Sequence, residues 1–245
     1  MRQFGLIGHP LTHSFSPTYF AEKFQKEGIS DASYTAFDLE DISQFPDLLK
    51  SNPELAGLNV TIPYKESIIP FLDQIDPVAG EIGSVNTILF QEGKTVGHNT
   101  DLIGISETLK PHLEWYMMTA LILGNGGSAK TVSYFLKKIG IQSLFITRNP
   151  SSADQISYSE LTEELIQKHK LIINCSPVGM FPNMEEKPAI PYEGITDMHV
   201  LFDLIYNPPM TQFLQEAQDR DATTLNGSKM LRLQAEASWK LWNRQ

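Results

Sequence analysis

The sequence contains little cysteine, no block of positive charge and no long apolar run. Its single cysteine, Cys175, cannot form a disulfide within the chain, which is typical of a reducing compartment. Lysine and arginine number 19 against 29 acidic residues, for a formal net charge of -10, whereas binding to nucleic acid phosphates needs clustered positive charge. No segment approaches the roughly 20 apolar residues of a membrane span, and no secretory signal is expected. These absences predict a cytoplasmic protein that binds neither nucleic acid nor membrane.

What the chain does contain is a steady alternation of short apolar runs with helical stretches. This alternation is typical of βαβ units and a largely parallel sheet. It starts at the N-terminus and starts again at Asp101, and 245 residues are enough for two domains of roughly 100 to 150 residues each. The sequence therefore predicts two α/β domains.

The first half predicts three parallel strands followed by a hairpin. Strands are expected at 4–7, 33–39 and 55–61, and helices at 17–27, 42–49 and 63–72. Ser16 is expected to cap the first helix, with Pro17 at its first position. The runs 85–90 and 94–97 flank Gln91-Glu92-Gly93, which predicts a hairpin at the sheet edge.

The second half predicts a further set of alternating elements. Helices are expected at 101–113, 128–139, 159–169, 210–218 and 228–242, and strands at 119–123, 143–147, 171–174 and 200–204. The pattern is again that of βαβ units, while the place of the last helix is ambiguous from the pattern alone.

A glycine-rich turn between the strand at 119–123 and the following helix has the spacing G-x-G-x-x-A. The residues are Gly124, Asn125, Gly126, Gly127, Ser128 and Ala129. In a dinucleotide site of this kind, Gly124 permits the tight turn, Gly126 lets the backbone approach a pyrophosphate, and Ala129 lets helix and strand pack closely. The phosphates bind at the positive end of the helix. A glycine loop that merely turns the chain is the alternative.

The end of the next strand distinguishes between the two nicotinamide dinucleotides. NAD enzymes usually carry an acid there that binds the ribose hydroxyls, whereas this chain has Thr147, Arg148 and Asn149. A guanidinium pairs with phosphate through charge-assisted hydrogen bonds, so the sequence favours NADP. The alternative for Arg148 is a solvated surface arginine.

Polar residues gather where the strands of the first half are predicted to end. They are Ser14 and Ser16, then Thr61 and Lys65, then Asn86, and finally Asp101 at the domain boundary. Taken singly, each has an ordinary structural alternative, such as a helix cap or an exposed lysine. Together they supply the hydroxyls, amide, cation and carboxylate that suit a polyhydroxylated carboxylate, and no metal-ligand spacing accompanies them.

These motifs, in this order and spacing, resemble those of the shikimate dehydrogenase family over almost the whole chain. The matching residues are Gly8-His9-Pro10, Ser14-x-Ser16-Pro17, Asn59-Val60-Thr61 with Pro63 and Lys65-Glu66, Asn86-Thr87, Asn99-Thr100-Asp101 with Gly104, the glycine turn, Tyr206 with Thr211 and Phe213-Leu214, and Asn226-Gly227 with Met230-Leu231 and Gln234-Ala235. The chain departs from the family pattern at Phe15, His98, Thr147-Arg148-Asn149 and Ser228-Lys229.

The resemblance implies a substrate-binding domain, formed by 1–100 with 226–245 and having a mostly parallel sheet, and a Rossmann-type NADP-binding domain at 101–225, with a cleft between them. It implies reversible NADPH-dependent reduction of 3-dehydroshikimate to shikimate by a monomer or homodimer. Ser14 and Ser16 would bind the substrate carboxylate, and Thr61, Asn86 and Gln234 its ring hydroxyls, with Tyr206 lining the site. Lys65 and Asp101 match the catalytic pair, and either could take the proton in the reverse oxidation.

Two alternatives remain at this point. One is a quinate/shikimate dehydrogenase that uses NAD, which would carry an acid after Ile146. The other is a non-catalytic sensor on the same scaffold, because fold alone does not imply chemistry. The presence of both Lys65 and Asp101 favours the enzyme.

Overall fold

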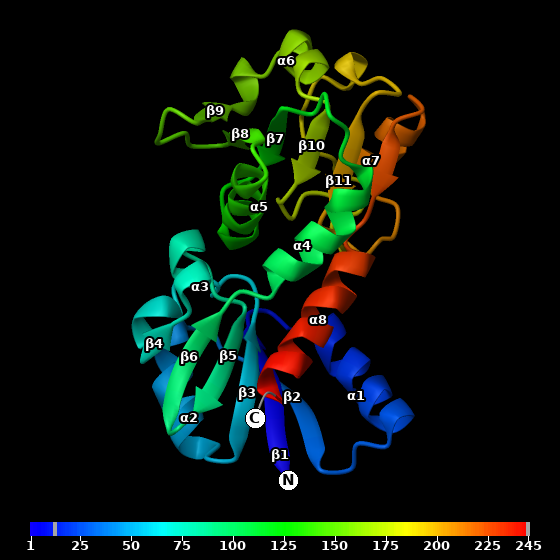
Figure 1. Cartoon of the computed structure of the whole chain (residues 1–245). Coiled ribbons are helices and arrows are strands. Elements are labelled where there is room, and N and C mark those ends of the chain that lie inside the picture. The colour runs from blue at the N-terminus through cyan, green and yellow to red at the C-terminus, as the bar shows by residue number, and fades with distance from the viewer. Residues whose placement is uncertain (12–13, 244–245) are drawn as a thin grey trace. The chain divides into compact units, whose positions relative to one another are not determined.

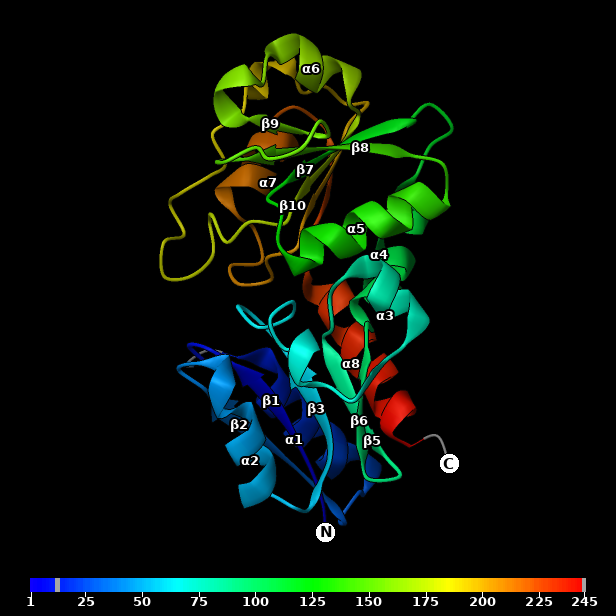
Figure 2. The ribbon, with the colours of Figure 1, turned by 90° about the vertical axis from the view of Figure 1, so that its left-hand side faces the viewer.

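The computed structural model describes residues 1–11 and 14–243 of the chain. The chain divides into a first unit, Met1–Thr100 with Ala235–Gln245, and a second unit, Asp101–Gln234. Each unit contains one six-stranded sheet with helices on both faces (Figures 1 and 2). The predicted α/β fold class is confirmed, and the second break between the units falls inside the last helix of the chain.

The sheet of the first unit combines parallel strands with one hairpin. Its order is β2 (Ala32–Asp38), β1 (Arg2–Gly8), β3 (Leu55–Val60), β5 (Thr87–Gln91), β6 (Lys94–His98) and β4 (Gln74–Ile75). β1 runs parallel to β2 and β3, and the β5–β6 pair is antiparallel, which confirms the predicted parallel strands and hairpin. Glu92 and Gly93 both have positive φ, as a tight hairpin turn requires. The prediction that the hairpin forms the sheet edge was wrong, because the two-residue strand β4 pairs outside β6.

Helices cover both faces of this sheet. α2 (Phe45–Ser51) and α3 (Pro77–Ile82) contribute to the hydrophobic cluster of one face. On the other face α1 (Phe15–Glu27) and the end of α8 (Ser228–Trp242) pack in an aromatic cluster with Phe4, where Phe4 and Trp242 stack with ring centroids 4.9 Å apart. β3 can lie against α8 because it carries Gly57, where a Cβ would come within 2.3 Å of the Trp242 indole nitrogen.

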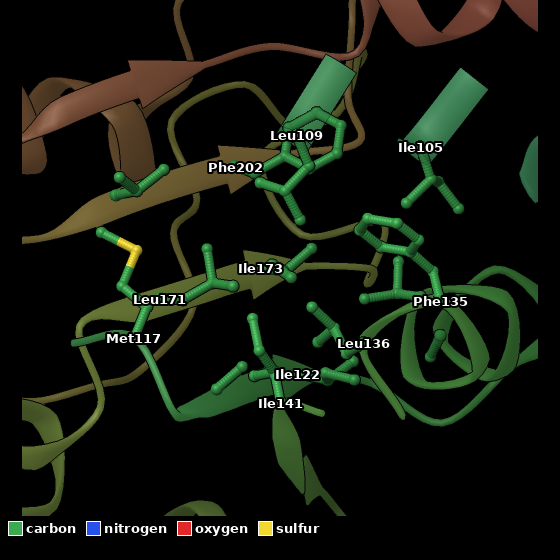
Figure 3. Packing of buried hydrophobic residues seen from close by; sticks show 14 of the residues in the cluster. Ile105, Leu109, Met117, Ile122, Phe135, Leu136, Ile141, Leu171, Ile173 and Phe202 are labelled. Atoms are coloured by element: carbon green, nitrogen blue, oxygen red, sulfur yellow. The ribbon is translucent and has the colours of Figure 1, made fainter. Parts of the chain in front are cut away.

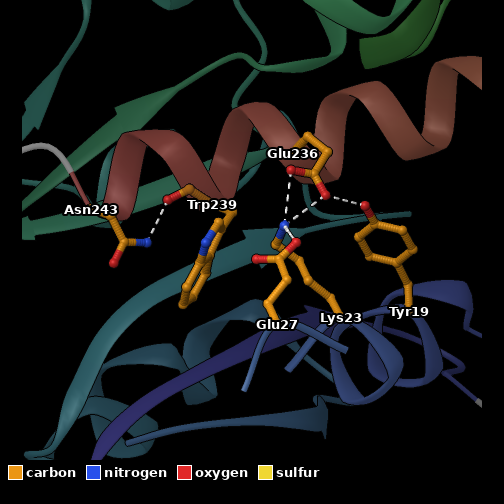
Figure 4. A network of polar contacts seen from close by, with 6 residues as sticks. All are labelled: Tyr19, Lys23, Glu27, Glu236, Trp239 and Asn243. Atoms are coloured by element: carbon orange, nitrogen blue, oxygen red, sulfur yellow. Dashed lines mark hydrogen bonds and ion pairs between the residues drawn. The ribbon is translucent and has the colours of Figure 1, made fainter. Parts of the chain in front are cut away.

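Polar contacts also join α8 to α1 in the first unit (Figure 4). The buried Lys23 ammonium lies 2.9 Å from Glu236 Oε1 and 2.6 Å from Glu27 Oε1, and the Tyr19 hydroxyl also donates to Glu236. The Trp242 indole nitrogen donates to the Ile88 carbonyl at 3.0 Å. The last turns of α8 are therefore held on the first sheet by both charge and packing.

The start of α1 differs from the prediction. The helix begins at Phe15 with Ser14 as its N-cap residue, so the expected cap at Ser16 was wrong. Pro17 is accommodated as the third helical residue because N–H groups in the first turn have no intrahelical acceptor. As a result Ser16 lies inside the helix and is buried.

The segment that carries Lys65 is not the α-helix expected at 63–72. It consists of turns followed by a single 3₁₀ turn, η2 (Ile69–Phe71). Pro70 has no N–H to donate to the Glu66 carbonyl, so a regular helix cannot continue through it. The backbone instead forms separate bonds, including Tyr64 N to Thr61 O at 2.9 Å and Ile68 N to Tyr64 O at 3.0 Å.

The sheet of the second unit is entirely parallel. Its order is β12 (Thr223–Leu225), β11 (Val200–Asp203), β10 (Leu171–Asn174), β7 (Thr119–Leu123), β8 (Gln142–Thr147) and β9 (Gln155–Ser157). Counted from β7, this is the strand order of a Rossmann fold, and the order reverses between β7 and β10. The predicted Rossmann-type domain is confirmed, although the three-residue strands β9 and β12 were not predicted.

Helices cover both faces of the second sheet as well. α4 (Asp101–Leu109) and α5 (Gly127–Lys138) pack on one face, where Figure 3 shows Leu109 and Phe135 in the core over the strands. α6 (Glu163–Lys168) and α7 (Gln212–Gln218) pack on the other face. The helix expected at 159–169 is divided into the 3₁₀ turn η4 (Tyr158–Glu160) and α6. The remaining 3₁₀ turns are η1 (Ile42–Gln44), η3 (Lys110–His112) and η5 (Tyr192–Gly194).

Two features are absent from residues 1–11 and 14–243. No helix in these ranges combines the length and apolar character of a membrane span. No group of three or more His, Cys, Asp or Glu side chains in the same ranges is arranged to hold a metal ion.

Candidate active site

The glycine turn of the second unit lies at the carboxyl end of β7. Gly124 has a φ of 105°, a conformation that favours glycine, and a Cβ there would lie 3.4 Å from the backbone of Cys175. Its N–H donates to the Ile146 carbonyl at 2.8 Å, and Cys175 N donates to Leu123 O at 2.9 Å. The turn is thus held between the ends of β8 and β10, at the point where the strand order reverses.

The second glycine of the turn faces open space. Gly126 is the N-cap residue of α5, and a Cβ at this position would meet nothing within 4 Å. Ala129 is fully buried against the sheet. Protein packing therefore explains the small residue at Ala129 but not the one at Gly126. Space at the positive end of a helix, lined by backbone N–H groups, suits a pyrophosphate.

The residues predicted to select the cofactor lie at the end of β8 and directly after it, next to the glycine turn. Thr147 is buried, whereas Arg148 and Asn149 are exposed. Burial raises the pKa of the Tyr158 hydroxyl, and the positive charge of nearby Arg148 partly offsets this rise. β7 and β8 pair in register from Thr119 with Gln142 to Leu123 with Ile146, so both parts of the predicted NADP site lie at adjacent strand ends.

Three of the predicted substrate residues lie on backbone segments that are bonded to one another in the first unit. Thr61 N donates to the Ile7 carbonyl at 2.9 Å, and the neighbouring Val60 N donates to Asn86 O at 2.8 Å. Val85 N donates to Lys65 O at 2.7 Å. The fold therefore brings the segments of Thr61, Lys65 and Asn86 together at the carboxyl end of β3.

The two predicted carboxylate-binding serines lie at the start of α1. Ser14 is the N-cap residue but makes no side-chain capping bond, so the simple cap interpretation does not account for its hydroxyl. Ser16 is 6% exposed and lies inside the helix. The two serines thus have different surroundings.

The other predicted substrate residues belong to the second unit. Asp101 is the first residue of α4 and is 3% exposed. Gln234, on α8, is buried and donates from Nε2 to the Leu231 carbonyl at 3.0 Å, and Tyr206 is partly buried after β11. Because Lys65 and Asp101 lie in different units, their pairing stays a prediction.

A buried carboxylate in the second unit was missed by the sequence reasoning. Asp203, at the end of β11, accepts from Asn174 Nδ2 at 3.1 Å, from Ile205 N at 3.0 Å and from the Thr211 hydroxyl at 2.7 Å. Burial raises its pKa to about 6 although these donors act to lower it. The available signal was a polar residue ending each of two apolar strands, Leu-Ile-Ile-Asn and Val-Leu-Phe-Asp.

Comparison with known proteins matches this chain to one family. A sequence model described as the shikimate dehydrogenase substrate binding domain matches residues 6–88. A shikimate dehydrogenase (NADP(+)) of Methanococcus maripaludis is 38% identical, over 97% of this chain and 90% of the relative. One of Desulforamulus reducens is 34% identical, over 97% of this chain and 88% of the relative. The chain belongs to the shikimate dehydrogenase family.

Solved structures of the family have the same fold. The shikimate 5-dehydrogenase of Thermus thermophilus, in complex with NADP(H) and shikimate, is 31% identical with a TM-score of 0.87, over 99% of this chain and 94% of the other. The quinate dehydrogenase of Corynebacterium glutamicum, in complex with NAD, is 25% identical with a TM-score of 0.86, over 99% of this chain and 93% of the other. The family resemblance inferred from the motifs is confirmed.

Proposed function

We propose that this protein is an NADP-dependent shikimate dehydrogenase, which catalyses the reversible reduction of 3-dehydroshikimate to shikimate in chorismate and aromatic amino acid biosynthesis. The observation that carries the proposal is the match of nearly the whole chain to relatives with this activity in their names, at 34% and 38% identity. The protein is an oxidoreductase, and its small-molecule substrate is a hydroxylated carboxylate.

The cofactor is NADP. The space at Gly126, the positive φ of Gly124 and the start of α5 support a pyrophosphate at the glycine turn. Asn125, Gly127 and Ser128 complete the proposed turn, and Thr147, Arg148 and Asn149 are proposed to surround the 2′-phosphate. An arginine in place of an acid favours NADP over NAD. When bound, NADPH supplies the hydride that reduces the ketone carbon.

The substrate carboxylate is proposed to accept hydrogen bonds from Ser14 and Ser16. Thr61, Asn86 and Gln234 are proposed to bind the ring hydroxyls, with Tyr206 against the substrate. The backbone bonds between the segments of Thr61, Lys65 and Asn86 support their assignment to one site. In domain terms, 1–100 with 226–245 binds substrate, and 101–225 binds NADP.

Lys65 and Asp101 are proposed as the catalytic pair. As the ketone carbon accepts the hydride, negative charge grows on its oxygen, where the Lys65 ammonium stabilises the charge and delivers the proton. Asp101 orients Lys65 and hydrogen-bonds a substrate hydroxyl. General acid catalysis of this kind contributes typically ~10²–10⁴-fold in rate.

A spectrophotometric assay tests the proposed function. The protein is mixed with shikimate or quinate and with NADP or NAD, and the absorbance of reduced nicotinamide is followed. We expect the nicotinamide to be reduced fastest when shikimate and NADP are present together. Faster reaction with quinate and NAD would favour the related quinate activity, and no absorbance change in any combination would favour a sensor.

The cellular location and the oligomeric state remain predictions. The single cysteine supports a cytoplasmic location. A monomer or a homodimer is proposed, and the mass measured by light scattering distinguishes the two.

A further inference from the structure

One continuous group of neutral polar side chains runs through the first unit. Its members come from β2, β3, β5, the segments beside β5 and β6, and α8, and they are Tyr34, Asn59, Asn86, Thr87, Thr100 and Ser238. All except the partly buried Tyr34 are no more than 5% exposed. Burying so many polar groups is unfavourable unless their hydrogen bonds are made. We call this group the hydroxyl–amide network.

Three hydroxyl groups form the centre of the hydroxyl–amide network. Thr87 Oγ1 lies 2.9 Å from both Thr100 Oγ1 and Ser238 Oγ, and the last two atoms are 3.0 Å apart. The Asn59 amide donates from Nδ2 to Ser238 at 2.9 Å and to Thr87 at 3.2 Å. Removing one hydroxyl would therefore take a hydrogen-bond partner from several buried polar atoms at once.

The hydroxyl–amide network ends at the Tyr34 hydroxyl on one side. Asn59 Oδ1 accepts from the Tyr34 hydroxyl at 2.8 Å. Asn59 Nδ2 also donates to the Asn86 backbone carbonyl at 3.3 Å. A carbonyl can only accept, so the Asn59 amide has one orientation.

At the other end the hydroxyl–amide network fixes the Asn86 amide. Asn86 Oδ1 accepts from the backbone N–H of Thr100 at 2.6 Å, and Asn86 Nδ2 donates to Thr100 Oγ1 at 3.0 Å. A backbone N–H can only donate, so the amide oxygen must face Thr100. The Nδ2 group of Asn86 is thereby held in one direction.

We propose that Tyr34, Asn59, Thr87, Thr100 and Ser238 are positioning residues for the substrate, because they hold the Asn86 amide in the orientation that binding needs. This inference rests on the proposed function, which assigns Asn86 to the substrate. Binding groups held in place before binding lose less freedom when the substrate arrives. Because Ser238 lies on α8, the position of the Asn86 amide depends on the packing of the last helix.

The decisive experiment is a pair of substitutions at Thr87, which is fully buried. Thr87→Val keeps the shape but removes the hydroxyl, whereas Thr87→Ser keeps the hydroxyl. We expect Thr87→Val to raise the KM for shikimate about ten-fold, as expected for loss of a buried hydrogen-bond partner. The KM for NADP should change by less than about two-fold, and Thr87→Ser should stay near wild type.

Thr95→Val is the matched control. Thr95 is a buried threonine on β6 of the same sheet, and its hydroxyl bonds Asp73 rather than the hydroxyl–amide network. Both valine variants should lower the thermal midpoint, but only Thr87→Val should raise the KM for shikimate. If the two variants lose similar stability and have the same KM for shikimate, Thr87 is merely structural and the proposal is wrong.

Two further variants keep the proposal testable. Tyr34→Phe removes a hydroxyl at the partly buried end, so it should raise the KM for shikimate even if Thr87→Val does not fold; an unchanged KM in Tyr34→Phe overturns the proposal. Asn86→Ala tests the underlying assignment separately. A normal KM in Asn86→Ala shows that the assignment of Asn86 is wrong. If Asn86→Ala raises the KM for shikimate while Thr87→Val and Tyr34→Phe leave it normal, only the positioning role is rejected.

Discussion

The two units form their polar sites at the ends of hydrophobic sheets from different kinds of groups. In the first unit, neutral hydroxyls and amides from distant segments bond to one another, as in the triangle of Thr87, Thr100 and Ser238. In the second unit, the glycine turn offers backbone groups, and the buried side-chain cluster is centred on a carboxylate, Asp203. A neutral network does not titrate near neutrality, whereas a buried carboxylate does.

This difference suits the two kinds of ligand. A ring with several hydroxyls requires donors and acceptors at fixed directions, which side chains supply when they are held by their neighbours. A pyrophosphate has a high charge and many equivalent oxygens, so backbone N–H groups at a helix start are enough. The predictions below test this division between a substrate side and a cofactor side.

The largest expected effect is that of Lys65→Ala on the substrate side. Loss of the ammonium at the ketone oxygen should lower turnover by ~10²-fold or more, because the growing negative charge is no longer stabilised. NADP binding should stay near wild type, since the proposed cofactor residues are untouched. Steady-state kinetics and an NADP titration check both points, and near-normal turnover would show that Lys65 is misassigned.

The next effect concerns Asp203 and pH. Burial raises the pKa of Asp203 to about 6 from an ordinary value of 3.8, so the folded state binds this proton more tightly than the unfolded state. The wild type should therefore lose stability as the pH rises from about 4 to about 6 and change little from this group above that range.

Asp203→Asn removes this titration and supplies the comparison. The free energy of unfolding of the wild type, relative to that of Asp203→Asn, should fall by up to about 3 kcal/mol between pH 4 and pH 7. Urea denaturation at several pH values measures the difference. Parallel pH profiles of the two proteins would refute the raised pKa of Asp203.

A smaller effect is expected at the glycine turn. Gly126→Val places a side chain where the structure has open space, so the thermal midpoint should change little. The same side chain would occupy the proposed position of the pyrophosphate, and the KM for NADP should rise about thirty-fold. The KM for shikimate is the internal control. A normal KM for NADP would mean that the phosphates do not approach Gly126.

The smallest effect is expected for Arg148→Ala. Loss of one charge-assisted contact should weaken the binding of NADP about ten-fold, because only NADP carries the 2′-phosphate. NAD should bind as before. Equal losses for both dinucleotides in a fluorescence titration would reject the role of Arg148.

Local patterns predicted many of the elements but not all of their ends. β7 lies at the predicted residues, and the α5 and hairpin predictions are close, because apolar runs and turn residues are strong local signals. The prediction of a helix at 63–72 was wrong because it extended the helix through Pro70, which has no N–H to donate. The short strands β9 and β12 carry too few residues for a local signal and exist because neighbouring strands offer them partners.

By itself the sequence determined the α/β class, the glycine turn, the arginine in place of an acid and the motifs of the family, since each depends on residues close together in the chain. Only the tertiary structure decided which polar residues meet. Asn59 and Ser238 are separated by 179 positions and bond at 2.9 Å because β3 and α8 pack against each other in the first unit. Such a contact depends on strand order and helix packing, which no local pattern encodes.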